Sequence, residues 1–81
     1  MADTKGDEQV LARIKELVEE EHALLSSKQL DQRSHARAES LRVELDQCWD
    51  LLRQRRAKRE FGDDPNQAKV RPARIVENYE Q

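Results

Sequence analysis

A chain of 81 residues is long enough for one small domain but too short to bury a large core, so its stability needs a further source. Cys48 is the single cysteine, which excludes an intramolecular disulfide, and no paired Cys/His spacing of the zinc-ribbon kind occurs. The formal charge of -2, from 15 basic and 17 acidic side chains, excludes neither a nucleic-acid nor a protein partner. Self-association is therefore the expected source of stability.

The sequence lacks the features of a secreted or membrane protein. The N-terminus has no apolar signal-peptide core, and no window approaches the ~20 apolar residues that a membrane-spanning helix needs. We therefore expect a cytoplasmic protein in which Cys48 stays reduced.

The first predicted element is an amphipathic helix over about residues 7–28, with Thr4 or Asp7 as its N-cap. At the helical angle of about 100° per residue, its aliphatic side chains fall within an arc of about 140°, which predicts one broad buried stripe. Acidic residues, Glu19 among them, occupy the opposite face and are expected to face water. The stripe consists of Val10, Leu11, Ile14, Leu17, Val18, Leu24 and Leu25.

A second, longer helix is expected over about residues 32–61. Residues 26–31 lack periodicity and supply turn-forming side chains, so we place a short connection there, with Asp31 or Ser34 as the next N-cap. A short connection predicts antiparallel neighbours. Neither proline nor glycine interrupts the second helix before Gly62. Its apolar seam has heptad-like spacing and consists of Ala38, Leu41, Leu45, Cys48 and Leu52, flanked by Trp49.

A third segment, over about residues 66–81, is expected to dock on this hairpin. Pro72 can begin a short helix that places Ile75, Val76 and Tyr79 on one side. A helix this short is marginal in isolation, so the segment must dock or be disordered. Its apolar residues favour docking.

Together these elements predict an all-α, coiled-coil-like antiparallel hairpin that dimerises into a four-helix bundle and acts as an interaction module. Glu21 and Arg56 interrupt the two apolar stripes, and we expect both to be partly buried. They lie at opposite ends of one hairpin, so they can meet only between two antiparallel hairpins; alternatively, both extend into water. The predicted oligomer interface consists of Leu41, Leu45, Cys48, Trp49, Leu52, Ile14, Leu17, Glu21 and Arg56.

The run from Arg53 to Arg59 holds five basic residues and no acidic one, which makes a small nucleic-acid-associated protein the alternative function. Against it, no aromatic residues are interleaved with the basic ones to stack bases, and cations also complement the negative end of a helix dipole. An antiparallel hairpin would further place this run level with the acidic start of the chain, around Asp7. We therefore expect the two charge blocks to neutralise each other and do not favour a nucleic-acid partner.

No arrangement of side chains predicts catalysis, a metal or a cofactor. Glu19-x-x-His22 has the spacing of di-iron bundles, but Glu19 points about 150° away from the centre of the apolar stripe. Cys48 lies among leucines, where burial would raise its thiol pKa. Trp49 is expected to pack in the core or dimer interface; alternatively, it is a binding hot spot for an unidentified protein partner.

The stretch from Glu44 to Ala57, ELDQCWDLLRQRRA, followed by Val70-Arg71-Pro72, resembles a family of small actinobacterial proteins catalogued as a domain of unknown function. The likeness extends over nearly the whole chain, including Leu11-Ala12-Arg13-Ile14 near its start. This resemblance implies a bacterial, cytoplasmic, helical protein. It implies no activity and no ligand-binding residue.

Overall fold

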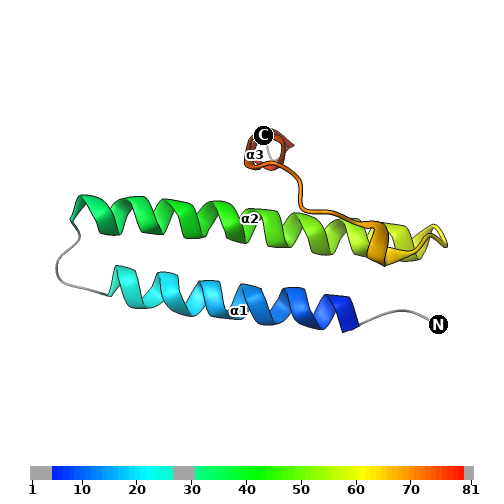
Figure 1. Ribbon diagram of the computed structural model, residues 1–81, viewed down its shortest axis with the longest axis horizontal. Helices are drawn as coiled ribbons and strands as arrows, with labels where there is room; N and C mark the ends of the chain where they lie inside the picture. Colours follow the sequence, from blue (N-terminus) through cyan, green and yellow to red (C-terminus); the bar gives the residue numbers. More distant parts are fainter. Residues whose placement is uncertain (1–4, 27–30, 80–81) are drawn as a thin grey trace.

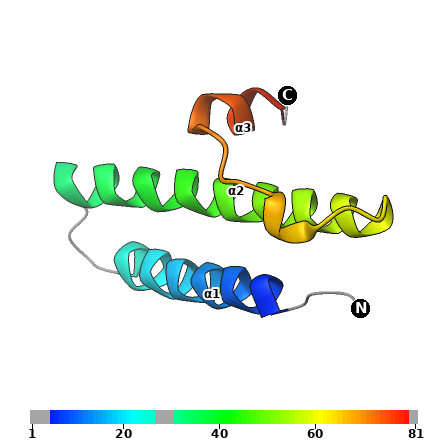
Figure 2. The same ribbon diagram turned by 45° about the vertical axis from the view of Figure 1, so that its right-hand side comes forward.

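The computed structural model describes residues 5–26 and 31–79, without the side chains of residues 77–79. This part contains two long helices, α1 (Lys5–Leu25) and α2 (Gln32–Glu60), then the short 3-10 helix η1 (Pro65–Gln67) and α3 (Ala73–Tyr79). Helices α1 and α2 lie antiparallel, and α3 lies on the side of α2 that faces away from α1 (Figure 1). The turned view in Figure 2 shows the same arrangement. The predicted all-helical hairpin is thus confirmed.

Both ends of α2 follow from local sequence. The Asp31 carboxylate accepts a hydrogen bond from the backbone N–H of Ser34 at 2.9 Å, which makes Asp31 the N-cap. At the other end the backbone N–H of Phe61 still donates to a helical carbonyl, and Gly62 then takes a φ of 77°. Glycine adopts this left-handed conformation without the steric cost that a Cβ imposes. The helix therefore ends where the sequence predicts.

Helix α1 begins slightly earlier than predicted. Because Lys5 is already helical, Asp7 lies within the first turn and is not the N-cap. The other candidate cap, Thr4, lies outside the described residues, as do residues 27–30 of the connection. Asp7 instead forms ion pairs with Arg55 and Arg59 of α2.

The apolar core lies between α1 and α2. Leu17 and Leu41 are fully buried, and Ile14 and Leu45 are nearly so. These residues are the centre of the two predicted seams, so the heptad-like spacing identified the contact correctly. The partly buried side chains that pack against this core are Val10, Leu24, Cys48 and Leu52.

Only part of the predicted α1 stripe is buried. Leu11, Val18 and Leu25 keep exposed fractions of 47%, 47% and 55%. A single neighbouring helix covers a seam narrower than the predicted arc, so the three side chains at one edge of the arc stay in solvent. Within one chain, the predicted burial of these three residues is therefore not found.

The segment after α2 returns along the outer side of that helix and is held there by polar groups. Asp50 is fully buried, and both its carboxylate oxygens accept hydrogen bonds from Arg71, one of them from Nε at 2.8 Å. The side-chain amides of Gln47 and Gln54 donate to the backbone carbonyls of Arg71 and Lys69, at 3.1 and 2.8 Å. We call Gln47, Asp50, Gln54 and Arg71 the tail clasp.

Helix α3 contacts α2 through a single apolar anchor among its described side chains. Val76 is buried, whereas Ile75, which we also expected to dock, is exposed. The side chain of Tyr79 lies outside the described residues. Pro72 precedes the helix, and its carbonyl accepts hydrogen bonds from the N–H groups of Ile75 and Val76. No helix in the described ranges is both long and apolar enough to cross a membrane.

Candidate functional site

One buried arginine joins three elements at the end of the hairpin where α1 begins and α2 ends. Arg55 is only 5% exposed. Its Nε donates to Asp7 Oδ1 at 2.5 Å, and its Nη1 donates to the Pro65 carbonyl and to Asn66 Oδ1, at 3.2 and 3.1 Å. Arg59 adds a second ion pair to Asp7, with Nη2 2.8 Å from Oδ2. These contacts tie α1, α2 and η1 together, and we call Arg55 the hub.

The hub confirms the predicted neutralisation for Arg55 and Arg59, which both pair with Asp7. The hydrogen bond from Arg59, with a further one from Arg55, lowers the pKa of Asp7, so its carboxylate stays ionised at neutral pH. Because Arg55 is enclosed by these partners, it cannot offer its guanidinium to a phosphate group.

Because Gly6 has no side chain, the guanidinium of Arg55 can occupy the space beside its backbone. A Cβ at this position would lie 2.3 Å from Arg55 Nη2, and Arg55 can withdraw only by breaking bonds to its partners. Helix propensity alone predicts that Gly6→Ala stabilises the chain by about 1 kcal/mol. We expect the opposite, a loss of about 1–2 kcal/mol in the free energy of unfolding, measured by urea denaturation.

The matched test repeats Gly6→Ala in an Arg55→Ala background, where the clash is absent. There the substitution should become neutral or stabilising. A stabilising effect in the wild-type background would show that the hub does not fill this space.

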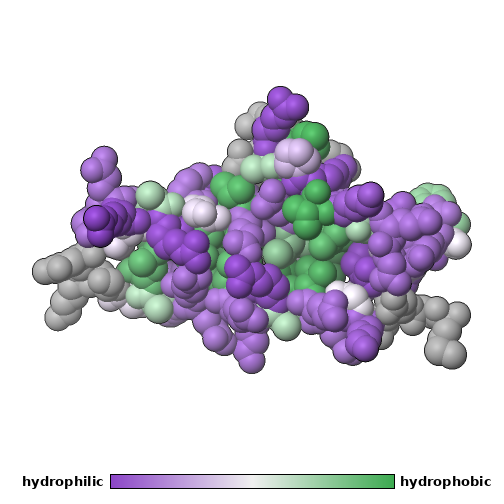
Figure 3. Space-filling view, viewed as in Figure 1, coloured by the Kyte–Doolittle hydropathy of each residue, from purple (hydrophilic) through white to green (hydrophobic). Residues whose placement is uncertain are grey.

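Ion pairs bridge the two helices along one flank of the hairpin. Arg13 Nη2 lies 2.7 Å from Glu44 Oε2, and Arg37 Nη2 lies 2.8 Å from Glu20 Oε1. Figure 3 shows one face of the molecule, on which hydrophilic side chains spread over both helices with a smaller apolar area between them. These pairs fix the antiparallel register at two points. We call this side the ion-paired flank.

The opposite flank of α1 is apolar. Leu11, Val18 and Leu25 recur every seven residues, so they lie in one line along the helix. Asp7 precedes Leu11 by about one turn and therefore shares its side. Because Asp7 lines a pocket together with Trp49, this tryptophan, 45% exposed, borders the same flank. We call the flank formed by Leu11, Val18, Leu25 and Trp49 the open flank.

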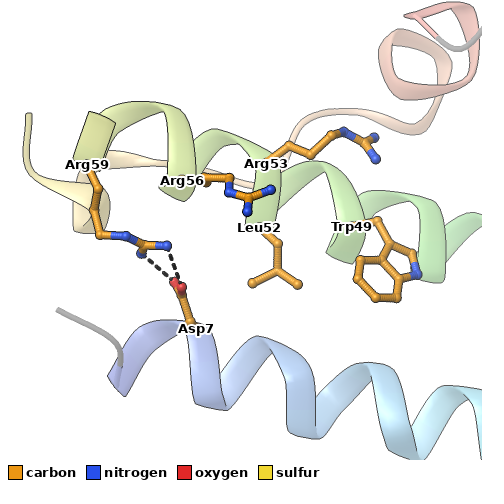
Figure 4. Close-up of a pocket in the computed structure, with 6 residues that line it drawn as sticks. All are labelled: Asp7, Trp49, Leu52, Arg53, Arg56 and Arg59. Carbon is orange, nitrogen blue, oxygen red and sulfur yellow. Dashed lines mark hydrogen bonds and ion pairs between the residues drawn. The ribbon is translucent and has the colours of Figure 1, made fainter. Parts of the chain in front are cut away.

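A shallow pocket of about 310 Å³ lies at the hub end of the open flank (Figure 4). Helix α2 contributes five of its lining residues, at spacings of three and four that place them on one side of the helix. That spacing is visible in the sequence and is the signal that could have linked Trp49 to the arginines. The lining consists of Asp7, Trp49, Leu52, Arg53, Arg56 and Arg59.

The residues predicted for the oligomer interface divide between interior and surface within one chain. Within one chain the side chain of Arg56 is 78% exposed, whereas Glu21 is half-buried. Their expected pairing between two chains stays a prediction. Fully buried residues such as Leu17 and Leu41 have no surface left for a second chain, so intact hairpins could pair only through exposed groups. Ile14, Leu17, Leu41 and Leu45 form the core, Cys48 and Leu52 lie beside it, and Trp49 is exposed.

The remaining reactive groups show no assembled chemistry in the described part of the chain. Burial raises the pKa of the Cys48 thiol, as expected for a cysteine in an apolar seam, so little of it is thiolate at neutral pH. Glu19 and His22 are both exposed. No group of three or more His, Cys, Asp and Glu side chains in residues 5–26 and 31–76 is placed to hold a metal ion.

Comparisons with known proteins identify relatives along almost the whole chain. The family described as "Protein of unknown function (DUF2630)" matches residues 6–81. "Uncharacterized protein Rv0898c" of Mycobacterium tuberculosis strain H37Rv is 50% identical over 80 residues, which covers 90% of this chain and 88% of the relative. "Uncharacterized protein Mb0922c" of Mycobacterium bovis gives the same values. No solved structure gives a significant match.

Proposed function

The chain belongs to the DUF2630 family of proteins of unknown function, and on this premise we propose that it is a self-associating helical module whose open flanks pair in a homodimer. One observation carries the proposal: three half-exposed aliphatic residues recur at heptad spacing on α1. In the described part of one hairpin, only four apolar residues form the buried α1–α2 core. A chain this small has little apolar core of its own, so burial of the open flank against a second copy would stabilise it.

A two-fold antiparallel arrangement centred on Val18 fits the stripe best. A closed dimer uses the same surface on both chains, so Val18 would face its own copy and Leu11 would face Leu25 of the second copy. Lys15 and Glu21 lie three residues on either side of Val18. This register therefore brings the exposed Lys15 of one chain beside the half-buried Glu21 of the other, with opposite charges. The two hairpins would form a four-helix bundle.

A pair between Glu21 and Arg56 of different chains requires another register. Arg56 lies beside the first turn of α1, because its neighbours Arg55 and Arg59 contact Asp7 there. Glu21 can reach this end only if the two α1 helices shift toward their N-termini. Leu25 would then extend past the partner helix and stay exposed. The stripe-centred register buries more apolar surface and is the one we propose.

The dimer is tested by light scattering and sedimentation at micromolar concentration. Val18→Glu should raise the dimer dissociation constant by at least about 100-fold, because each dimer would bury two unpaired carboxylates. Ala12→Glu adds the same charge at an exposed site on another side of α1 and should change little. A wild-type chain that remains monomeric over the whole concentration range would contradict the proposal.

Exchanging charged residues tests, in the same assay, how the two α1 helices are aligned in the dimer. Glu21→Lys should weaken the dimer about three- to tenfold, since partly exposed ion pairs contribute modestly. Adding Lys15→Glu should restore affinity if the stripe-centred register is correct. Adding Arg56→Glu should restore it only in the shifted register with the Glu21–Arg56 pair. Recovery in the second double variant alone would overturn the register that we propose.

A further inference from the structure

The pocket at the hub end combines two kinds of surface. Trp49 and Leu52 form an apolar wall and point toward α1 in Figure 4, where Arg56 and Arg53 extend from the upper side of α2 and Arg59 turns to Asp7. Arg53, Arg56 and Arg59 follow one another at three-residue intervals, which advance about 4.5 Å each along a helix axis. A flat aromatic group thus stands next to a row of guanidinium groups on a single element.

The charge of the pocket is positive. Of its six lining residues three are arginines and one, Asp7, is acidic. Asp7 already forms ion pairs with Arg59, which also lines the pocket, and with the buried Arg55, so the negative charge of Asp7 is compensated. Arg53 and Arg56 are exposed and sit nearest to the tryptophan along the helix. An anionic ligand would therefore meet a net positive field at the apolar wall.

We propose that this pocket binds a nucleotide unit, with the base stacked on Trp49 and the phosphate held by Arg53 and Arg56. Guanidinium groups match phosphate oxygens in bidentate geometry, and an indole stacks on any base. The volume suits one such unit, since small-molecule sites begin at about 300 Å³. An acidic peptide would satisfy the arginines but would offer no flat group to the indole.

No aromatic residue is interleaved within the basic run itself, but Trp49, one helical turn before it, lines the same pocket. The nucleotide unit could be a free nucleotide or one residue of a single-stranded nucleic acid. All six lining residues belong to one chain, so a monomer has the complete pocket. Because Trp49 also borders the open flank, pairing of the open flanks would compete with ligand binding.

Fluorescence titration tests the pocket directly, because Trp49 is the only tryptophan in the sequence. The probes are ADP and a short oligothymidylate, with excitation at the red edge of indole absorption to avoid absorption by the bases. We expect saturable quenching at low salt by at least one probe. Quenching by ADP alone identifies a free nucleotide, and preferential binding of the oligonucleotide identifies a single strand. With two phosphate contacts, raising salt fourfold should weaken oligonucleotide binding about sevenfold.

Matched variants decide whether the pocket is responsible. Arg53→Gln and Arg56→Gln should each weaken binding at least about tenfold with unchanged helicity, because both side chains are exposed. Arg33→Gln, at an exposed arginine near the start of α2, should bind as the wild type does. Val18→Glu should also retain binding, even as a monomer.

Three results would overturn the inference. The first is that neither probe quenches Trp49 saturably at low salt. The second is that Arg33→Gln loses as much affinity as the pocket variants, which would mean non-specific attraction. The third is that polyglutamate binds as tightly as the nucleotide probes. Binding that disappears in Val18→Glu would equally rule out a pocket built by a single chain.

Discussion

Replacing Arg55 with methionine should lower the free energy of unfolding by about 3 kcal/mol. This is the largest loss of stability that we expect from removing one buried charge. Removing one member of a buried ion pair typically costs about 3–5 kcal/mol. Here Asp7 keeps Arg59 as a partner, which places the expected loss at the lower end. The carbonyl of Pro65 and the side chain of Asn66 also lose their shared donor. Urea denaturation at one fixed protein concentration measures the change.

Arg56→Met is the matched control, one residue further along α2. Its side chain is 78% exposed and lies 3.9 Å from Glu60, at the outer limit of an ion pair. Exposed substitutions of this kind usually change stability by less than about 0.5 kcal/mol. Equal losses in the two variants would show that Arg55 acts only as one more member of a basic run.

Arg71→Gln should release the tail while leaving the hairpin folded. Asp50 is fully buried, so without Arg71 its carboxylate loses two charged hydrogen bonds, keeps the one from the Gln54 amide and regains hydration if the tail leaves. We expect trypsin to cleave after Arg74, in α3, at least about tenfold faster, which corresponds to a docking loss of about 1.4 kcal/mol. Far-ultraviolet circular dichroism should show that most helicity persists. Unchanged cleavage would mean that Val76 alone holds α3.

The clasp should also respond to acid. The hydrogen bond from Arg71 is the main cause that lowers the pKa of Asp50 in the docked state. A lowered pKa in the folded state stabilises docking at every pH above the ordinary aspartate value and is lost as the pH falls through the lowered value. Docking should therefore be constant at neutral pH and weaken only below about pH 4. In Arg71→Gln this acid-dependent step in the cleavage rate should be much smaller.

Sequence patterns located the seam and placed the basic run level with Asp7, but they did not reveal the tail clasp. Leu41 and Leu45 were identified by heptad-like spacing, which is a local property of one helix. Gln47, Asp50 and Gln54 also share a helical side, but it lies opposite the seam and resembles an ordinary solvated surface. Only the return of the chain over that side makes Asp50 a buried residue.

By itself the sequence determined the elements, their antiparallel pairing and family membership. Periodicity, the Asp31 cap and the Gly62 stop act within a few residues, and a short connection leaves little choice of direction. The tertiary structure decided which faces are covered: it left Leu11, Val18 and Leu25 in solvent and enclosed Arg55. Burial depends on where distant segments approach. The spacing of residues along one helix shows which side chains share a face. It does not show how much of that face is covered, since a single neighbouring helix covers only a narrow seam.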